Sequence, residues 1–505
     1  MDIEGRMRET ATASPDRPAV IWQDRVVTYG DLNTRIDAAA VTMQARGLGV
    51  GSVVAIQLGN VPAFVEAYHA CLRIGAVAVP LSIALAPDEV AHALADSGAD
   101  LFIVSSAVAN NMVDIALELD IPAVVAGGDV HLPSTSRWSE FLAGDGFPEA
   151  AAVSQDDLAA LVYTSGTTGR PRGAMLTRGN LRANQDQALT GRFTVGPDDV
   201  ALLVLPLSHI YSLNVGLGAC LRVGAAIVLQ ERFDPVSTLE TIQRQQVTIL
   251  LGAPPMYVAW TTLPELPEGA FDSVRLAVSG AAPLSVPVLE AFRDRTGLTI
   301  EEGYGLTEAS PAVTSNSMAP VARPGTVGMA LPGVELRVVE LAGGPNPEDV
   351  AIGDPGEVWV RGPNVFAGYH NDEAATEATL TSDGWLRTGD IGILDADGYL
   401  RLVDRNKDLV IVSGFNVYPR EVERVLDLHE SVVKSAVIGV PHPYTGEAVK
   451  AFVVATDDQV TEDDLVAFCR AHLARYKCPE VFEFVTSLPH TASGKLRRVQ
   501  LRERE

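Results

Sequence analysis

The stretch SVVAIQLGNVPAFVEAYHACLRIGAVAVPLS, residues 52–82, decides the fold class of this chain. Its two ends, residues 52–59 and 76–82, are short valine-rich apolar runs that predict buried strands. Between them, residues 61–75 carry apolar side chains at helical spacing and end in Gly75, which predicts a helix. A strand, a helix and a second strand in this order are typical of a parallel sheet covered by helices.

The same alternation extends outward from this stretch, as far as about residue 310. Before it, residues 19–23 predict a strand and residues 28–47 a helix. After it, residues 86–98 predict a helix and residues 99–106 a strand. The fold class is therefore α/β, with a large N-terminal domain of layered α/β subdomains.

Beyond residue 310 the character of the sequence changes twice. Glycine and proline become dense in short runs such as DPGEVWVRGPNVFAGYH, which predicts a small β-barrel-like piece. From about residue 408, strand and helix patterns form a compact α+β unit of roughly a hundred residues. We place a domain boundary near VDRNKD, residues 403–408.

Composition excludes several classes of protein. The 505 residues include 38 basic and 64 acidic ones, a net charge of −26, and such a surface repels nucleic acid and anionic membranes. No apolar stretch reaches the roughly eighteen residues of a membrane span, and the N-terminus lacks the apolar segment of a signal peptide. We therefore expect a cytoplasmic protein with no nucleic-acid partner and no membrane span.

The run YTSGTTGRPRGAM, residues 163–175, combines hydroxyl residues and glycines in one loop. Bare amides and hydroxyls suit an anion with many oxygens, so this run predicts a phosphate-binding loop. It is not the common P-loop, because Ala174 and Met175 follow Gly173 where that motif requires Lys and Ser or Thr. We expect a buried strand, residues 158–166, to enter the loop and a helix, residues 176–189, to follow it.

Five further segments place charged or hydroxyl residues beside glycines or in turns. They are VSGAAPLS (278–285), EEGYGLTEAS (301–310), DGWLRTGDIG (383–392), VDRNKD (403–408) and PHTASGKLRR (489–498). Each alone has an ordinary structural explanation as a turn, a packed aromatic or a basic tail. In this order, the segments resemble the adenylate-forming superfamily of acyl-CoA synthetases, luciferases and nonribosomal peptide adenylation domains. The resemblance runs from TYGDL (28–32) to GKLRR (494–498), and HIYSLN (209–214) resembles plant coumarate–CoA ligases.

The resemblance implies a fold and a reaction. A carboxylic acid is activated with ATP as an acyl-adenylate, and the thiol of coenzyme A then attacks this anhydride. Two anions meet in the first step, so positive charge and aligned donors must supply most of the catalysis. The family fold implies an N-terminal domain at residues 1–403, a hinge at 404–408 and a small mobile C-terminal domain at 409–505.

The resemblance also implies roles for individual residues, most of them toward ATP. The phosphate loop holds the β- and γ-phosphates with Thr164, Ser165, Gly166, Thr167, Thr168, Gly169 and Arg172. The adenine site, where Tyr304 stacks on the base, comprises Gly280, Ala281, Ala282, Glu302, Gly303, Tyr304 and Gly305. Thr307 reaches the α-phosphate, and Asp390 and Arg405 bind the ribose. Thr164 and Glu308 face Mg²⁺, a hard cation that prefers carboxylate and phosphate oxygens as ligands.

The catalytic residues that the resemblance implies are Lys495, His209, Glu308 and Thr164. Lys495 bridges the carboxylate and the α-phosphate, and rotation of the small domain about Lys407 then withdraws it. His209 lies beside the carboxylate. The residues implied to line the coenzyme A passage are Ser413, Gly414 and Phe415.

The acid pocket implied by the resemblance is lined by His209, Tyr211, Gly280, Gly305, Pro311 and Ala312. The runs that carry these residues, 209–219, 279–282 and 305–313, contain no Lys or Arg that could pair with a second substrate carboxylate. Malonate-activating relatives have Arg where Gly303 stands, so both observations disfavour a dicarboxylate as substrate. We expect a medium- or long-chain fatty acid first and an aryl acid of the cinnamate type next. Coenzyme A is the expected acceptor because the sequence ends soon after GKLRR; a carrier protein as acceptor and a homodimer are left open.

Two residues depart from the family pattern. The family usually has Lys where Arg172 stands, and plant coumarate ligases have Lys where Ile411 stands. Two further alternatives stay open: a nucleotide-binding sensor without turnover, and the oxygen-dependent light reaction of luciferases.

Overall fold

The structure is a computed structural model of the chain, which divides into two compact units that we describe separately. It describes residues 5–128, 132–164, 171–192, 194–341, 344, 347–405, 408–412, 415–442, 446–456, 460–473, 475–490 and 496–504. Unit 1 comprises Met1–Glu335 and Val360–Leu386, and unit 2 comprises Leu336–Trp359 and Arg387–Glu505. Within the described ranges, no helix combines the length and the apolar character that crossing a membrane requires. The boundaries expected at residues 403–409 stay a prediction.

The strand, helix and strand expected at residues 52–82 are confirmed. They are β3 (Val53–Gln57), α3 (Pro62–Ile74) and β4 (Val77–Pro80), and β3 and β4 pair in parallel. Pro62 starts the helix at a position where no backbone N–H is needed. Gly75 ends it with φ 76°, a left-handed conformation that glycine adopts without steric cost.

These strands belong to a seven-stranded sheet of unit 1, counted over the described residues. Its order is β7 (Thr135–Arg137), β6 (Ala123–Ala126), β5 (Leu101–Ser105), β3, β4, β8 (Leu158–Thr164) and β9 (Arg172–Thr177). The pairs are parallel except β8 with β9. Helices α4 (Pro87–Ser97) and α5 (Ala109–Glu118) pack on it around Phe102 and Val104, which are fully buried. The remaining helices of this region are α1 (Gly5–Ala13), α2 (Tyr29–Ala45), α6 (Trp138–Phe141) and α7 (Arg178–Ala188).

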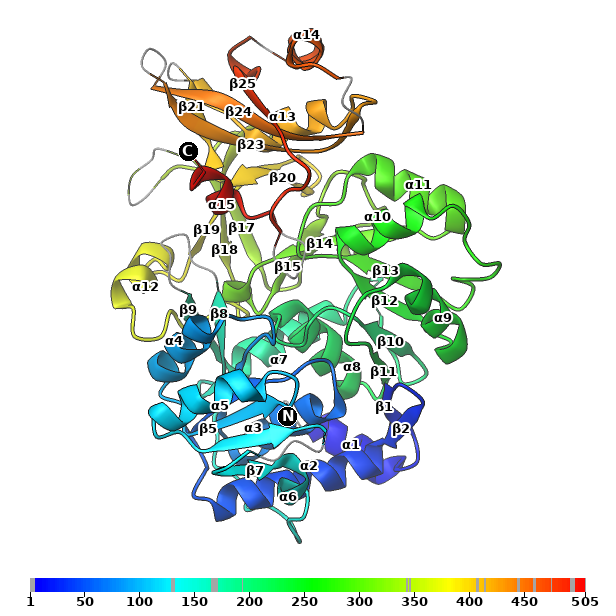
Figure 1. The fold of residues 1–505 in the computed structure, drawn as a ribbon, viewed down its shortest axis with the longest axis vertical. Coiled ribbons are helices and arrows are strands. Elements are labelled where there is room, and N and C mark those ends of the chain that lie inside the picture. Colours follow the sequence, from blue (N-terminus) through cyan, green and yellow to red (C-terminus); the bar gives the residue numbers. More distant parts are fainter. Residues whose placement is uncertain are drawn as a thin grey trace. The chain divides into compact units, whose positions relative to one another are not determined.

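A second sheet of unit 1 has nine strands in the described part of the chain. Its order is β16 (Met329–Ala330), β15 (Ala312–Ser315), β14 (Ile300–Gly305), β13 (Leu276–Ser279), β12 (Ile249–Gly252), β10 (Val200–Leu203), β11 (Ala226–Leu229), β1 (Pro18–Trp22) and β2 (Arg25–Thr28). Helices α9 (Pro235–Gln245), α10 (Pro254–Thr262) and α11 (Val286–Thr296) lie beside β12 and β13 (Figure 1). Tyr257, Trp260 and Phe292 form an edge-to-face aromatic cluster between them. Two short helices, α8 (Ala219–Arg222) and α12 (Glu373–Thr379), complete the helices of unit 1 that the structure describes.

Unit 2 contains the segment expected to be barrel-like and the expected α+β unit. The first is a four-stranded sheet of β17 (Glu335–Val339), β18 (Pro355–Arg361), β19 (Leu386–Leu394) and β20 (Leu400–Arg405). The second is a sheet of β22 (Phe415–Val417), β21 (Val410–Val412), β24 (Gly446–Ala455) and β23 (Val432–His442), with β25 (Val481–Phe484) paired to β24. These counts refer to the described residues.

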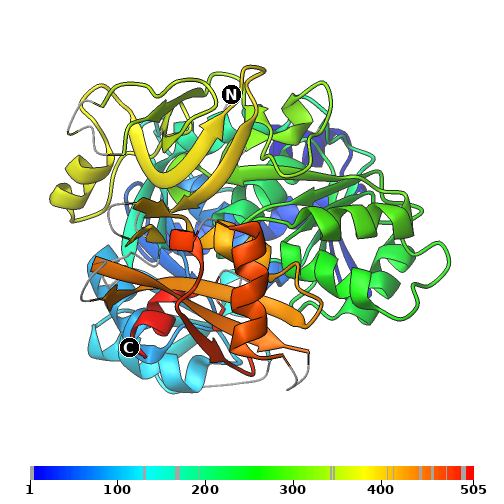
Figure 2. The same cartoon turned by 90° about the horizontal axis from the view of Figure 1, so that it is seen from above.

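The second sheet of unit 2 is covered on both faces. Helices α13 (Pro419–Leu426) and α14 (Glu462–His472) pack through Val422 and Leu465 onto one side. Helix α15 (Arg498–Arg502) packs through Leu501 beside Ile438 and Phe452, in a separate cluster. In Figure 2, α14 is the orange-red helix that crosses the strands of this sheet.

Candidate active site

The expected phosphate loop lies between two strands. Thr164 ends β8 and Arg172 begins β9, and these two residues are paired across the antiparallel strands. Ser165, Gly166, Thr167, Thr168 and Gly169 lie outside the described residues. The helix expected at residues 176–189 is confirmed as α7 (Arg178–Ala188), and β9, a strand that the sequence did not predict, lies between the loop and this helix. Helix α7 begins only at Arg178, where the Thr177 hydroxyl accepts a hydrogen bond from the Asn180 amide.

Arg172, which departs from the family's Lys, is held by an acidic partner. Its Nε lies 2.9 Å from Asp372 Oδ2. Its guanidinium carbon lies 5.7 Å from the centre of the Tyr369 ring. A planar guanidinium makes both contacts, whereas a lysine ammonium is a point charge. The predicted role of Arg172 toward the nucleotide stays a prediction.

The residues expected to bind adenine meet at one edge of the nine-stranded sheet. Strands β13 and β14 are parallel neighbours with Ser279 opposite Glu302, so the residues after both strands lie at the same edge. The Glu302 carboxylate accepts a hydrogen bond from the Leu284 amide at 3.3 Å, which holds the turn after β13. In that turn Ala281 has φ 68°, a left-handed conformation that is uncommon for a non-glycine residue and concentrates at functional sites.

The side chains at this edge differ in exposure. Gly280 is buried, and Ala281 and Ala282 are half-buried. In β14, Tyr304 is buried, while Gly303 is half-buried. The sequence therefore predicted correctly that these two segments come together, and stacking of adenine on Tyr304 stays a prediction.

Thr307 and Glu308 lie in a short 3₁₀ helix, η2 (Thr307–Ala309), directly after β14. The Glu308 carboxylate accepts a hydrogen bond from the Tyr369 hydroxyl at 2.7 Å, and its backbone carbonyl accepts one from the Phe366 amide at 2.9 Å. Strand β9, which follows the phosphate loop, lies against η2. The fold therefore brings Glu308 to the strand that leaves the phosphate loop.

A magnesium ion fits this arrangement only together with substrate phosphates. Among the residues that the structure describes, no group of three His, Cys, Asp or Glu side chains forms a metal cage. Mg²⁺ is usually held by one or two carboxylates plus the phosphates of the substrate. Glu308 and the Thr164 hydroxyl are donors of the kind that such a site uses.

The expected acid pocket is built around a π-helix, η1 (Tyr211–Gly218), a rare form that is frequent at functional sites. The Tyr211 ring lies against Gly280, where an added Cβ would be 3.1 Å from Tyr211 Cε1. Asn214 of the π-helix donates a hydrogen bond to the Ser310 carbonyl at 2.7 Å, next to Pro311. His209 precedes the π-helix and is exposed.

The opposite wall of this pocket is tightly packed. Gly305 is paired with Ala312 across β14 and β15. A Cβ on Gly305 would lie 2.0 Å from the Pro311 carbonyl oxygen, so glycine is required there. Tyr211 thus lies against Gly280, and Gly305 lies against Pro311 and Ala312; the pocket expected from these residues and His209 stays a prediction.

The Tyr211 hydroxyl is buried and has no hydrogen-bond partner among the described residues. Burial raises the pKa of the Tyr211 phenol above its ordinary value, so the hydroxyl keeps its proton. A buried hydroxyl without a partner costs on the order of 1–3 kcal/mol. It is a donor that a bound ligand can satisfy.

In unit 2 the two residues expected to bind ribose lie on neighbouring strands. Asp390 in β19 is paired with Arg405 in β20, and Asp390 is buried. The Asp390 amide donates to the Thr388 hydroxyl at 3.1 Å. The remaining residues predicted in this unit, Lys407, Ser413, Gly414 and Lys495, lie outside the described residues, and Phe415 is described only as the first residue of β22.

Sequence reasoning missed Tyr369 and Asp372, which contact Glu308 and Arg172 respectively. Their segment, FAGYHND (366–372), had been interpreted only as part of a glycine- and proline-rich β region. The signal that could have found it is a tyrosine beside glycine in an otherwise polar loop, which is weak.

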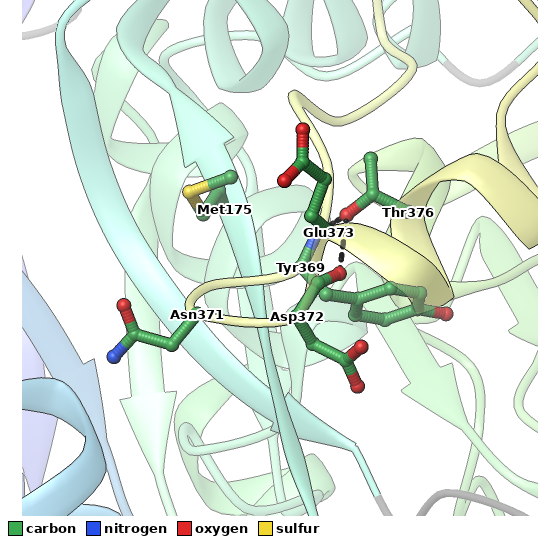
Figure 3. Close-up of a pocket in the computed structure, with 6 residues that line it drawn as sticks. All are labelled: Met175, Tyr369, Asn371, Asp372, Glu373 and Thr376. Atoms are coloured by element: carbon green, nitrogen blue, oxygen red, sulfur yellow. Dashed lines mark hydrogen bonds between the residues drawn. The ribbon is translucent and has the colours of Figure 1, made fainter.

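A pocket of about 440 Å³ opens beside this segment (Figure 3). Its lining residues are Met175, Tyr369, Asn371, Asp372, Glu373 and Thr376. Figure 3 shows the Thr376 hydroxyl accepting from the Tyr369 amide and donating to the Asp372 carbonyl, both at 2.9 Å. These bonds fix the backbone that presents Tyr369 and Asp372.

Comparisons with known proteins agree with the geometry. The family model for "AMP-binding enzyme" matches residues 7–370, and that for "AMP-binding enzyme C-terminal domain" matches residues 421–495. The chain is 38% identical to a feruloyl-CoA synthase of Amycolatopsis sp., over 98% of this chain and 97% of the relative. It is 35% identical to a long-chain-fatty-acid–CoA ligase of Yersinia pestis, over 97% and 92% of the two chains.

A solved structure gives the same result for the fold. The ATP-bound MatB from Rhodopseudomonas palustris superimposes with a TM-score of 0.92 at 33% identity, over 100% of this chain and 99% of that one. The fold of this chain is thus shared with a solved ATP-bound protein. This chain belongs to the AMP-binding enzyme family of the adenylate-forming superfamily, as an AMP-forming acyl-CoA synthetase.

Proposed function

We propose that this acyl-CoA synthetase activates an aryl acid with a polar ring substituent, of the hydroxycinnamate type, and transfers the acyl group to coenzyme A. The observation that carries the proposal is the buried Tyr211 hydroxyl, which lacks a partner among the described residues and lies at the expected acid pocket. A ring hydroxyl or methoxy oxygen accepts a hydrogen bond from it. An alkyl chain leaves it unsatisfied, as it is without ligand, and so gains no binding free energy from this hydrogen bond.

The comparisons support the aryl acid without deciding it, because the relatives include both a feruloyl-CoA synthase and long-chain-fatty-acid ligases. A medium- or long-chain fatty acid, which the sequence placed first, is therefore the second candidate. It would occupy the same pocket beside Gly280, Gly305 and Ala312.

In the proposed reaction, the residues act by binding and by neutralising charge. The phosphate loop and Thr164 bind the triphosphate, and Glu308 and Thr164 hold Mg²⁺, which would offset the negative charge of the phosphates. Lys495 donates to the carboxylate and the α-phosphate where charge develops as pyrophosphate leaves. His209 lies beside the activated carboxylate.

Pyrophosphate release across a panel of acids tests the proposal. The panel contains ferulic, 4-hydroxycinnamic, cinnamic and benzoic acids and fatty acids from C2 to C18, each with ATP, Mg²⁺ and with or without coenzyme A. We expect the hydroxylated cinnamic acids to give the highest kcat/KM, and free coenzyme A to be consumed. A carrier-loading enzyme would release pyrophosphate without consuming coenzyme A. A maximum for C8 to C18 acids would reject the aryl assignment, and no release with any acid would reject acid activation itself.

Replacing Tyr211 by phenylalanine removes only the hydroxyl. We expect kcat/KM for ferulic acid to fall by about fivefold, because one hydrogen bond contributes on the order of 1 kcal/mol. Unsubstituted cinnamic acid has no ring oxygen to accept from Tyr211, so its kcat/KM should stay within about twofold. The measurement is steady-state kinetics with both acids. Equal losses for the two acids would mean that Tyr211 does not recognise the substituent.

A further inference from the structure

Glu308, the carboxylate proposed to hold Mg²⁺, has a fixed orientation in this structure. Its Oε1 accepts the hydrogen bond from the Tyr369 hydroxyl at 2.7 Å. The described residues offer no hydrogen bond to its other oxygen, Oε2. A carboxylate held through one oxygen presents the second one to an incoming cation. The hydrogen bond therefore decides which oxygen faces the metal.

Tyr369 is itself held by several independent contacts. Its backbone amide donates to the Thr376 hydroxyl at 2.9 Å (Figure 3). Its ring packs edge-on against Phe366, with ring centres 5.0 Å apart. The Arg172 guanidinium carbon lies 5.7 Å from the centre of the same ring. The hydroxyl that reaches Glu308 is thus presented by a side chain with little rotational freedom.

The backbone on either side of Tyr369 is tied to the strand that leaves the phosphate loop. The Met175 amide donates to the Gly368 carbonyl at 2.9 Å, and the His370 amide donates to the Gly173 carbonyl at 2.8 Å. Between these bonds, Ala174 and Tyr369 form a β-bridge. The position of Tyr369, and through it the orientation of the Glu308 carboxylate, is therefore fixed by β9. The loop before β9 is proposed to bind the triphosphate, which would contact the same metal ion as Glu308.

The Tyr369 hydroxyl is a neutral donor to Glu308. It adds no positive charge that would compete with a cation for the carboxylate.

We infer that Tyr369 is a positioning residue, which orients the Glu308 carboxylate for the magnesium ion of the adenylation step. This inference rests on the proposed metal role of Glu308. Hydrogen-bond partners that orient a metal-binding carboxylate commonly change metal affinity by about 10- to 100-fold when they are removed. We therefore expect Tyr369 to control metal affinity rather than the affinity for ATP without metal.

The test is Mn²⁺ binding, followed by electron paramagnetic resonance, to the full chain saturated with α,β-methylene-ATP. Tyr369→Phe should raise the Kd for Mn²⁺ by about tenfold. Its affinity for the metal-free analogue and its thermal unfolding midpoint should stay close to those of the unchanged protein. The midpoint shows that the variant is folded, so a weaker Kd cannot come from unfolding.

A matched control is available in Tyr29→Phe. The Tyr29 hydroxyl is buried and donates to the Ala225 carbonyl at 2.8 Å, and Tyr29 begins α2, outside the residues expected to bind the substrates. The substitution again removes one tyrosine hydroxyl that donates a hydrogen bond, but away from Glu308. We expect Tyr29→Phe to leave the Kd for Mn²⁺ within about twofold.

A double variant tests whether Tyr369 acts through Glu308. In a Glu308→Gln background, Tyr369→Phe should cause no further loss of Mn²⁺ affinity, because the partner that it orients has already been changed. Additive losses would overturn the inference, as would an unchanged Kd for Tyr369→Phe or an equal loss for Tyr29→Phe. If the unchanged protein with the analogue binds no Mn²⁺, both the metal role of Glu308 and the inference fail. If it binds Mn²⁺ and Tyr369→Phe does too with equal affinity, only the inference fails.

Discussion

Replacing Lys495 with alanine should slow acyl-adenylate formation by about 100-fold or more and leave thioester formation from supplied acyl-adenylate largely intact. A preorganised donor aimed at developing charge typically contributes this much to the rate. In the first step the carboxylate and the α-phosphate are both anionic, so the amine is needed there. In the second step a neutral thiol group attacks an anhydride that is already formed, so the requirement disappears.

The two half-reactions can be measured separately. Pyrophosphate exchange reports adenylation, and conversion of chemically prepared acyl-adenylate with coenzyme A reports thioester formation. Lys434→Ala is a matched control, because Lys434 belongs to the same unit and is 58% exposed in a pair with Asp427. It should change neither rate by more than about twofold. Equal loss of both half-reactions in a folded Lys495→Ala variant would contradict the proposed role and the rotation about Lys407.

Replacing Arg498 with methionine should lower the free energy of unfolding of unit 2 by about 3–5 kcal/mol, as is found when one partner of a buried ion pair is removed. Arg498 Nη2 lies 2.6 Å and 2.7 Å from the two oxygens of Glu423. Its Nη1 lies 3.6 Å from Asp408, which Arg502 also contacts at 2.7 Å. The Arg498 side chain is 10% exposed and those of Glu423 and Asp408 are 13% and 6% exposed. The substitution therefore leaves the Glu423 carboxylate in a buried place without its charge partner, whereas Asp408 keeps Arg502.

Urea unfolding of the full chain, followed by circular dichroism, measures this loss in the transition of unit 2. Lys434→Met is the control: its pair with Asp427 has an N–O distance of 3.1 Å, and the Lys434 side chain is exposed while Asp427 is half-buried. Exposed pairs contribute about 0–1 kcal/mol, so the control should shift the transition little. A similar shift for both variants would show that the Arg498 cluster is not a buried network. Arg498 lies three residues after Lys495, so the cluster also anchors the chain that follows the proposed catalytic lysine.

The elements of the α/β layers could be predicted because their signals are local. Residues 61–75 were expected as a helix and form α3 (Pro62–Ile74), since apolar spacing, proline at the start and glycine at the end lie within one segment. Strand β9 was missed because it is short and only two of its residues, Ala174 and Leu176, are buried apolar side chains. Its strand conformation comes from pairing with β8, which no local pattern reveals.

The sequence by itself determined the class of fold, the order of the glycine and hydroxyl motifs and hence the family of AMP-binding enzymes. Those features are carried by residue types at short spacings, and short spacings can be read without coordinates. Only the tertiary structure decided that Tyr369 meets Glu308 across 61 residues of chain, that the strands of Asp390 and Arg405 pair at these residues, and that the Tyr211 hydroxyl is left without a partner among the described residues. Such contacts depend on which distant strands pair and on what space their side chains leave, and neither quantity is a property of any one segment.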